Sequence, residues 1–143
     1  MIIDQLNQFS SAQAITAIGS TPSTNVVDLG VARDIGGAAT ENLALLVQVV
    51  TTFTSGGSAT LQVQFQTSPD NATWSNPAIS DAIPVAQLVA GYKFLVNELP
   101  GPTSRYLRLN YIIGTAVMTA GTLTAAIVSA IDVLPSYPRA YVA

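Results

Sequence analysis

Residues 60–67 alternate between apolar and polar side chains without a break. The run reads Thr-Leu-Gln-Val-Gln-Phe-Gln-Thr, so Leu61, Val63 and Phe65 share one side of an extended chain and glutamines share the other. Successive side chains of a β-strand point to opposite faces, so this pattern predicts a strand with one buried face. Helical periodicity of useful length is missing, although residues 10–18 are compatible with a short helix. The chain is therefore expected to be all-β.

Further strands are expected where similar apolar and β-branched runs recur. They cover residues 25–31, 43–53, 92–98, 105–113 and 121–131, with a weaker run at 85–89. Turn-forming sequences separate these runs, among them Ser-Gly-Gly-Ser at 55–58, Ser-Pro-Asp-Asn at 68–71 and Pro-Gly-Pro at 100–102. About seven short strands, with turns roughly every ten residues, predict one antiparallel β-sandwich.

The two ends of the chain do not follow this pattern. Residues 1–24 end in the polar run Gly-Ser-Thr-Pro-Ser-Thr, and residues 132–143 contain two prolines and two tyrosines. Proline favours an extended backbone, and tyrosine is a common anchor at protein interfaces. We therefore expect a sandwich over residues 25–131 with an N-terminal arm, 1–24, and a C-terminal tail, 132–143. The alternative is that both ends of the chain are frayed and contact no partner. The residues expected to bind a partner are Ile2, Ile3, Leu6, Phe9, Tyr137, Arg139 and Tyr141.

Charged side chains are scarce for a soluble domain. They make up 9% of the residues, against 49% hydrophobic residues, and the mean hydropathy is +0.43. Soluble domains usually carry about 25% charged residues. A surface with so few charges leaves large apolar areas unbroken, which is typical of membrane proteins or of proteins covered by other subunits.

A membrane location is not expected. A spanning helix needs about 20 consecutive apolar residues. The two most apolar runs, 43–50 and 123–131, are short and are interrupted by Gln48, Thr124 and Ser129. The first residues show neither the basic nor the apolar region of a signal peptide, so we expect synthesis in a cytoplasm. The low charge is therefore interpreted as a surface shared with other protein.

Nucleic acid is not an expected partner either. The net charge is −3, and the basic residues are scattered along the sequence, whereas phosphate binding requires clustered lysine and arginine. These basic residues are Arg33, Lys93, Arg105, Arg108 and Arg139.

The sequence contains no histidine and no cysteine. Ser–His and Cys–His catalysis and soft-metal sites are therefore excluded. The carboxylates form no calcium-binding motif. Asp70 is expected to shape the turn at 68–71, and Asp34 is expected to pair locally with Arg33. We predict no enzymatic activity, no cofactor and no metal site.

Two classes of function rank ahead of a third, a hydrolase on a sandwich scaffold, for which the sequence shows no catalytic constellation. A structural assembly protein accounts for the low charge and the terminal arms. A carbohydrate-binding or adhesive sandwich is the alternative, and it requires an exposed aromatic platform. Trp74 is the candidate platform, although a role as a core or hairpin anchor is the more common one for a tryptophan beside a turn. Native mass separates the two classes, because an assembly protein oligomerises or binds a large particle.

Several segments point to one known family. They are Phe-Ser-Ser-Ala-Gln-Ala-Ile-Thr at 9–16, Ser-Thr-Asn-Val-Val-Asp-Leu-Gly at 23–30, Arg-Asp-Ile-Gly at 33–36, Leu-Gln-Val-Gln at 61–64, Ser-Pro-Asp-Asn at 68–71 with Trp74, Arg-Tyr-Leu-Arg-Leu-Asn-Tyr at 105–111, Gly-Thr-Leu-Thr-Ala at 121–125 and Tyr-Pro at 137–138. Together they resemble the capsid cement (decoration) proteins of tailed bacteriophages, of the Bordetella-phage type.

This resemblance implies a jelly-roll β-sandwich with extended N- and C-terminal arms. It implies a homo-oligomer, dimer or trimer, on the outer surface of a virion capsid, made in the cytoplasm of the host bacterium. Such a protein clamps the major capsid protein beneath it against the pressure of packaged DNA. The family supplies no catalytic residues to carry over.

Overall fold

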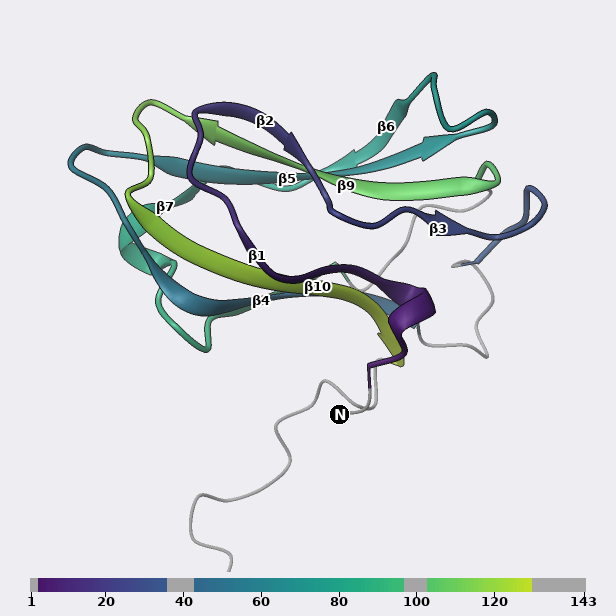
Figure 1. The fold of residues 1–143 in the computed structure, drawn as a ribbon, viewed down its shortest axis with the longest axis horizontal. Coiled ribbons are helices and arrows are strands. Elements are labelled where there is room, and N and C mark those ends of the chain that lie inside the picture. Colours follow the sequence, from purple (N-terminus) through teal and green to yellow (C-terminus); the bar gives the residue numbers. More distant parts are fainter. Residues whose placement is uncertain (1–2, 36–42, 97–102, 130–143) are drawn as a thin grey trace, which may run out of the picture.

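The computed structural model describes residues 3–35, 43–96 and 103–129, shown as a ribbon in Figure 1. Its strands are β1 (Gln8–Ala14), β2 (Gly19–Pro22), β3 (Val27–Asp28), β4 (Leu43–Thr54), β5 (Thr60–Ser68), β6 (Ser75–Ile79), β7 (Ile83–Pro84), β8 (Lys93–Val96), β9 (Tyr106–Gly114) and β10 (Ala120–Ser129). Its helices are the 3₁₀ turns η1 (Gln5–Asn7) and η2 (Val85–Gln87). Within these described residues, no helix is both long enough and apolar enough to span a membrane.

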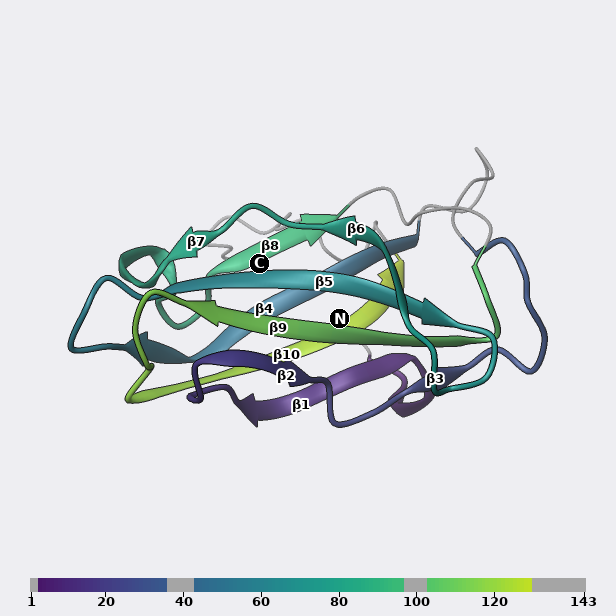
Figure 2. The same cartoon turned by 90° about the horizontal axis from the view of Figure 1, so that it is seen from above.

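Two antiparallel sheets face each other (Figures 1 and 2). The four-stranded sheet has the order β1-β10-β4-β8, and the six-stranded sheet has the path β2-β9-β5-β6, with β3 beside β9 and β7 beside β5. The pairings are nested along the chain, because β1 pairs with β10, β2 and β3 with β9, β4 with β8, and β5 with β6 and β7. Such a folded-over ribbon, closed into two sheets, is a jelly roll. The expectation of an all-β sandwich is confirmed.

The alternating strands supply the core between the sheets. Leu61, Val63 and Phe65 of β5 are buried, as the pattern predicts. The same holds for β9, whose apolar positions Leu107 and Leu109 are fully buried. Side chains of β4 and β10 close the core from the opposite sheet. Burying one such side chain contributes about 1.5–3 kcal/mol, so these alternating faces are the main source of stability.

The predicted strand at 25–31 is much shorter in the structure. Only Val27–Asp28 pairs, because the chain turns away at Gly30, whose φ is +77°. The Gly30 amide donates to the Asp28 carboxylate at 2.8 Å, which is a local side-chain turn that ends the strand. At 85–89 the weak run forms η2 rather than a strand. The strands β6 and β7 were not predicted, since neither alternates clearly.

The N-terminal segment corrects the predicted arm. Residues 8–22 form β1 and β2, which are edge strands of the two sheets. Residues 10–18 contain no helix, because Gln8–Ala14 is extended and pairs with β10. The residue pattern did not predict this strand, because β1 contains two register shifts and a positive φ of 45° at Ala12. A bulged edge strand does not alternate regularly between buried and exposed side chains. The predicted tail, 132–143, lies outside the described residues.

Candidate interaction surfaces

The carboxylates of the described residues serve local structure. No group of three or more of them is arranged to hold a metal ion within residues 3–35, 43–96 and 103–129. Asp70 shapes its turn as predicted, because it accepts hydrogen bonds from the Ala72 amide at 2.9 Å and the Thr73 amide at 2.7 Å. These amides, with the Ser68 hydroxyl, lower the pKa of Asp70 to about 2. A carboxylate held in this way is a turn element rather than a free ligand.

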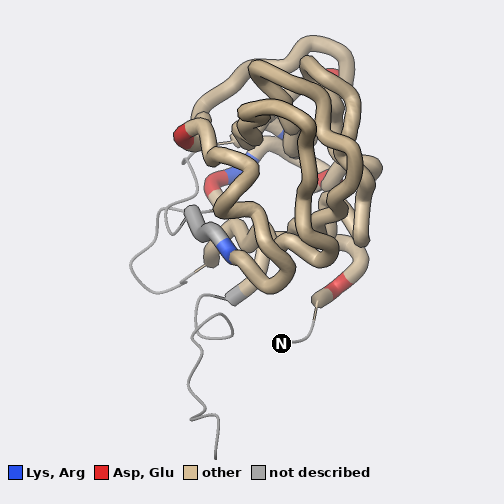
Figure 3. Tube along the Cα trace, turned by 90° about the vertical axis from the view of Figure 1, so that its left-hand side faces the viewer, with Lys and Arg blue, Asp and Glu red and all other residues tan. Residues whose placement is uncertain are grey.

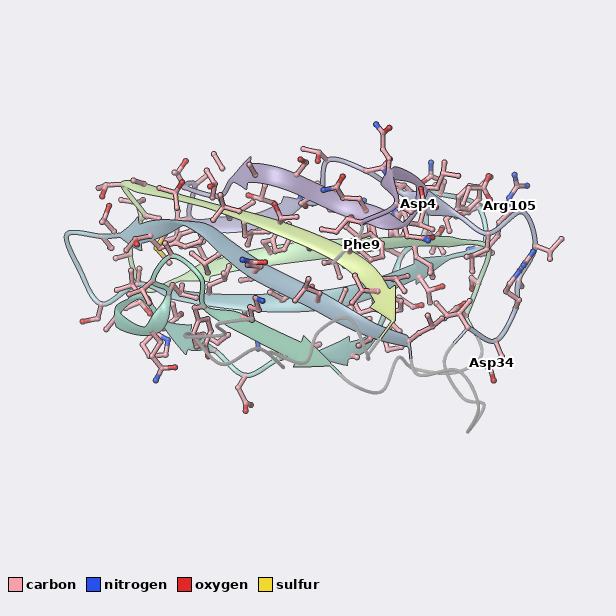
Figure 4. The ribbon with its side chains drawn as sticks, turned by 90° about the horizontal axis from the view of Figure 1, so that it is seen from below. Asp4, Phe9, Asp34 and Arg105 are labelled. Atoms are coloured by element: carbon pink, nitrogen blue, oxygen red, sulfur yellow. The ribbon has the colours of Figure 1, made fainter. Side chains whose placement is uncertain are left out.

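One ion pair ties β3 to the start of β9. The Arg105 guanidinium donates two hydrogen bonds to Asp28, each of 2.8 Å. This pairing, together with the Gly30 amide, lowers the pKa of Asp28 to about 2. Arg33 donates to the Leu29 carbonyl at 2.8 Å. Figure 4 shows that Arg105 lies in the same half of the sandwich as Asp4 and Asp34.

The outer face of the six-stranded sheet carries a network of polar side chains. The Arg108 guanidinium lies 3.9 Å from the centre of the Trp74 ring and donates to the Gln66 side chain at 2.7 Å. Gln66 in turn donates to Asn76 at 2.7 Å. Trp74 is therefore a half-buried anchor beside the β5–β6 turn, as expected for a hairpin anchor, and one face of its ring is covered. Partial burial lowers the pKa of Arg108.

The outer face of the four-stranded sheet carries a second, smaller apolar cluster. Leu46 of β4 pairs with Ala126 of β10, and both are buried although their strand neighbours point into the main core. Val128 belongs to the same cluster. Ile3, one of the predicted contact residues, is partly buried against it. The start of the chain therefore lies on the outside of this sheet.

Two hollows open beside this N-terminal segment. The larger has a volume of about 760 Å³ and is lined by η1, β1 and residues 24–29 with Arg33. Leu6 lines it and is 78% exposed, which makes it the most exposed of the large apolar side chains described. The smaller hollow has about 240 Å³ and lies between Asp4 and Leu43. We call this part of the molecule, with Ile3, Leu6 and both hollows, the terminal end.

Phe9 is not a surface contact. Its side chain is fully buried, and its ring meets that of Phe65 edge to face with 6.4 Å between centroids. Figure 4 shows it among the strands rather than outside them. The prediction for Phe9 is wrong because β1 is part of the sandwich. Ile2, Tyr137, Arg139 and Tyr141 lie outside the described residues.

The opposite end of the sandwich is formed by four connecting segments without a charged residue. They are residues 15–18, 55–59, 85–92 and 115–119, which we call the loop end. Three large apolar side chains are exposed there: Ile18 at 56%, Val89 at 50% and Val117 at 53%. This surface was not predicted from the sequence. The lack of charge in each segment was visible, but only the fold brings the four segments together.

The match to a known family agrees with the extent of this fold. The sequence model of the Bbp16 family matches residues 9–127, from β1 to β10. The chain belongs to the Bbp16 family. This membership confirms the coarser part of the resemblance, a protein family of Bordetella-phage type, while the name Bbp16 states no activity. The matched region includes all or most of each described strand and leaves out Ile3 and Leu6. No curated protein matches this member of the Bbp16 family.

Proposed function

We propose that this chain is a structural virion protein that binds the outer surface of a bacteriophage capsid and stabilises the shell of major capsid protein. The observation that carries the proposal is the loop end, an uncharged surface with three half-exposed apolar side chains on a protein of only 9% charged residues. Membership of the Bbp16 family supports it. The role is a binding role without catalysis, cofactor, nucleic acid or membrane.

The physical basis is the kind of surface that a cementing protein needs. Many modest contacts, repeated by symmetry, hold such a protein, and no single strong site is required. Thr, Ser and Gln side chains find hydrogen-bond partners when they are buried in an interface, whereas an unpaired buried charge is costly. The terminal end, with Ile3 and the exposed Leu6, offers a second surface for neighbouring copies in a homo-dimer or homo-trimer.

The test is binding to capsids that lack this protein. Purified protein is mixed with such capsids, the particles are separated from free protein, and the bound copies are counted by imaging. Saturable binding in a symmetric arrangement, with greater resistance of the particle to heat, is the expected result. A protein that stays in the free fraction at all concentrations contradicts the proposal.

The contribution of the tail is tested separately. Deletion of residues 133–143 is expected to leave the sandwich folded and to weaken binding to the particle, because Tyr137, Arg139 and Tyr141 are the proposed anchors of the tail on neighbouring copies or on the capsid. Unchanged occupancy of the truncated protein on the same capsids would remove the tail from the proposal and leave the rest standing.

The carbohydrate-binding alternative has less support. A sugar ring stacks on a free aromatic face, but Arg108 covers one face of Trp74 and the Arg105 guanidinium lies 4.8 Å from the centre of the Tyr106 ring. Specific binding of the monomeric chain to a glycan, lost on Trp74→Ala, is the result that would favour this alternative.

A further inference from the structure

The charged residues of the described chain avoid the loop end. They lie at the N-cap of η1, in or after β3, in the β5–β6 turn, between β6 and β7, at the start of β8 and around the start of β9. These residues are Asp4, Asp28, Arg33, Asp34, Asp70, Asp81, Lys93, Arg105 and Arg108. Figure 3 looks onto the loop end, and its nearest loops are tan, the colour of uncharged residues. The four segments of the loop end thus carry no charge, and the nearest charged residue in the sequence is Lys93, which follows segment 85–92.

The segments of the loop end are anchored in the core. Each contributes a buried side chain, and these are Ile15, Ala59, Leu88 and Met118. The exposed residues Ile18, Val89 and Val117 lie within three positions of such an anchor. Core packing therefore fixes the backbone on which the exposed apolar side chains stand.

Hydrogen bonds also join the segments to one another and to the sheets. The Met118 amide donates to the Thr16 carbonyl at 3.1 Å, and the Ser55 hydroxyl donates to the Val117 carbonyl at 2.7 Å. The Val85 amide donates to the Ala59 carbonyl at 2.9 Å. A surface ordered in this way loses little conformational entropy when it binds, which favours association.

From this arrangement we infer that the loop end is the surface that docks onto the capsid shell, and that it meets an uncharged, apolar area of the shell. The inference rests on the proposed function. A charged area would be a poor partner, because the loop end has no opposite charge to pair with a desolvated ion. Ile18, Val89 and Val117 are the contact residues.

The position of the chain ends favours the shell over a second copy as the occupant. Ile3 packs at the terminal end, where β4 begins and β10 ends, whereas the loop end lies where β4 ends and β10 begins. The first and last described residues, Ile3 and Ser129, therefore lie far from the loop end. A protein that cements a shell needs one surface for the shell and another for its neighbours, and the sandwich keeps these two at opposite ends.

The experiment places a charge in the proposed interface. Val117→Asp and Ile18→Asp are compared with Ile79→Asp, a matched control on β6 with the same 53% exposure as Val117. Apparent affinity for capsids lacking the protein is measured, with the thermal midpoint and native mass of each variant. The two loop-end variants are expected to bind about tenfold more weakly or worse, while Ile79→Asp binds like the parent chain.

The outcomes separate the inference from the proposed function. If the parent chain does not bind capsids at all, the proposed function fails. If the parent binds and the folded loop-end variants bind equally well, the proposed function stands and the inference is overturned. If these variants lose self-association and keep their capsid binding, the loop end holds a second copy, which also overturns the inference. If a variant unfolds, Val117→Ser, which adds no charge, replaces it and is expected to show a smaller loss.

Discussion

The ring of Phe53 occupies the position that a β-carbon of Gly121 would take. Gly121 sits in a register shift between β10 and β4 with a φ of +138°, and a β-carbon added there would overlap the Phe53 ring. Only glycine combines this backbone conformation with such a close approach. The contact joins the ends of two central strands of the four-stranded sheet, next to the loop end.

Gly121→Ala is therefore expected to destabilise the protein. The substitution places a methyl group inside the space of a buried ring and strains the backbone, and together these cost about 2–4 kcal/mol of unfolding free energy. Urea unfolding measures the loss. Gly56→Ala is the matched control, because nothing lies within 4 Å of its β-carbon position, and it should change stability by less than about 0.5 kcal/mol. Equal stabilities of the two variants would contradict the packing argument.

A buried hydrogen bond of Tyr111 is expected to make the stability of the protein fall at alkaline pH. Tyr111 is fully buried, and its hydroxyl lies 2.7 Å from that of Ser10. Since Ser10 donates its proton to Gln13 at 2.7 Å, Tyr111 is the donor to Ser10. Burial raises the pKa of Tyr111 well above its ordinary value.

The folded chain thus keeps the Tyr111 proton at a pH where the unfolded chain loses it. The stabilisation is complete below the unfolded pKa of about 10 and is lost as pH rises above it. Tyr111→Phe should cost about 1 kcal/mol at neutral pH and should flatten this alkaline loss. Unfolding free energies between about pH 8 and pH 11 check both expectations, and parallel curves for the two proteins would refute the assignment.

Phe9 and Leu6 give a direct test of where the N-terminal arm ends. Phe9→Ala removes a core ring and is expected to cost about 3–5 kcal/mol of stability. Leu6→Ala changes a side chain that is 78% exposed, so stability should change by less than about 0.5 kcal/mol. Thermal unfolding of the pair decides the point. A stable Phe9→Ala protein would restore Phe9 to the arm.

The Asp28–Arg105 pair predicts a small acid dependence of stability. Because the pKa of Asp28 is lowered to about 2, its contribution is present above the ordinary carboxyl value of about 4 and is lost as pH falls towards 2. Arg105→Gln should move this pKa back towards the ordinary value. NMR titration of the Asp28 carboxyl measures the shift in its pKa. Salt screens an exposed ion pair of this kind, so adding salt should reduce the shift. A carboxyl that titrates near 4 in the parent chain would disprove the pairing.

Much of the sandwich followed from local patterns. The alternation in β5 and in β9 determined which side chains are buried, because one residue of shift would put every leucine of those strands into water. The turn at 68–71 was equally local, since Asp70 bonds to amides two and three residues away. The exclusion of nucleophile–histidine chemistry needed only the missing residue types.

Other features were decided by the tertiary structure alone. β1 was hidden because its bulges break the alternation, and its place in the sandwich depends on pairing with β10, more than a hundred residues away. Ser10 and Tyr111 meet for the same reason. The loop end likewise exists only in the fold, since four uncharged segments become one surface when the nested ribbon brings them to the same end. The sequence determined that charged side chains are scarce. The jelly-roll topology decided which surface carries no charged side chain.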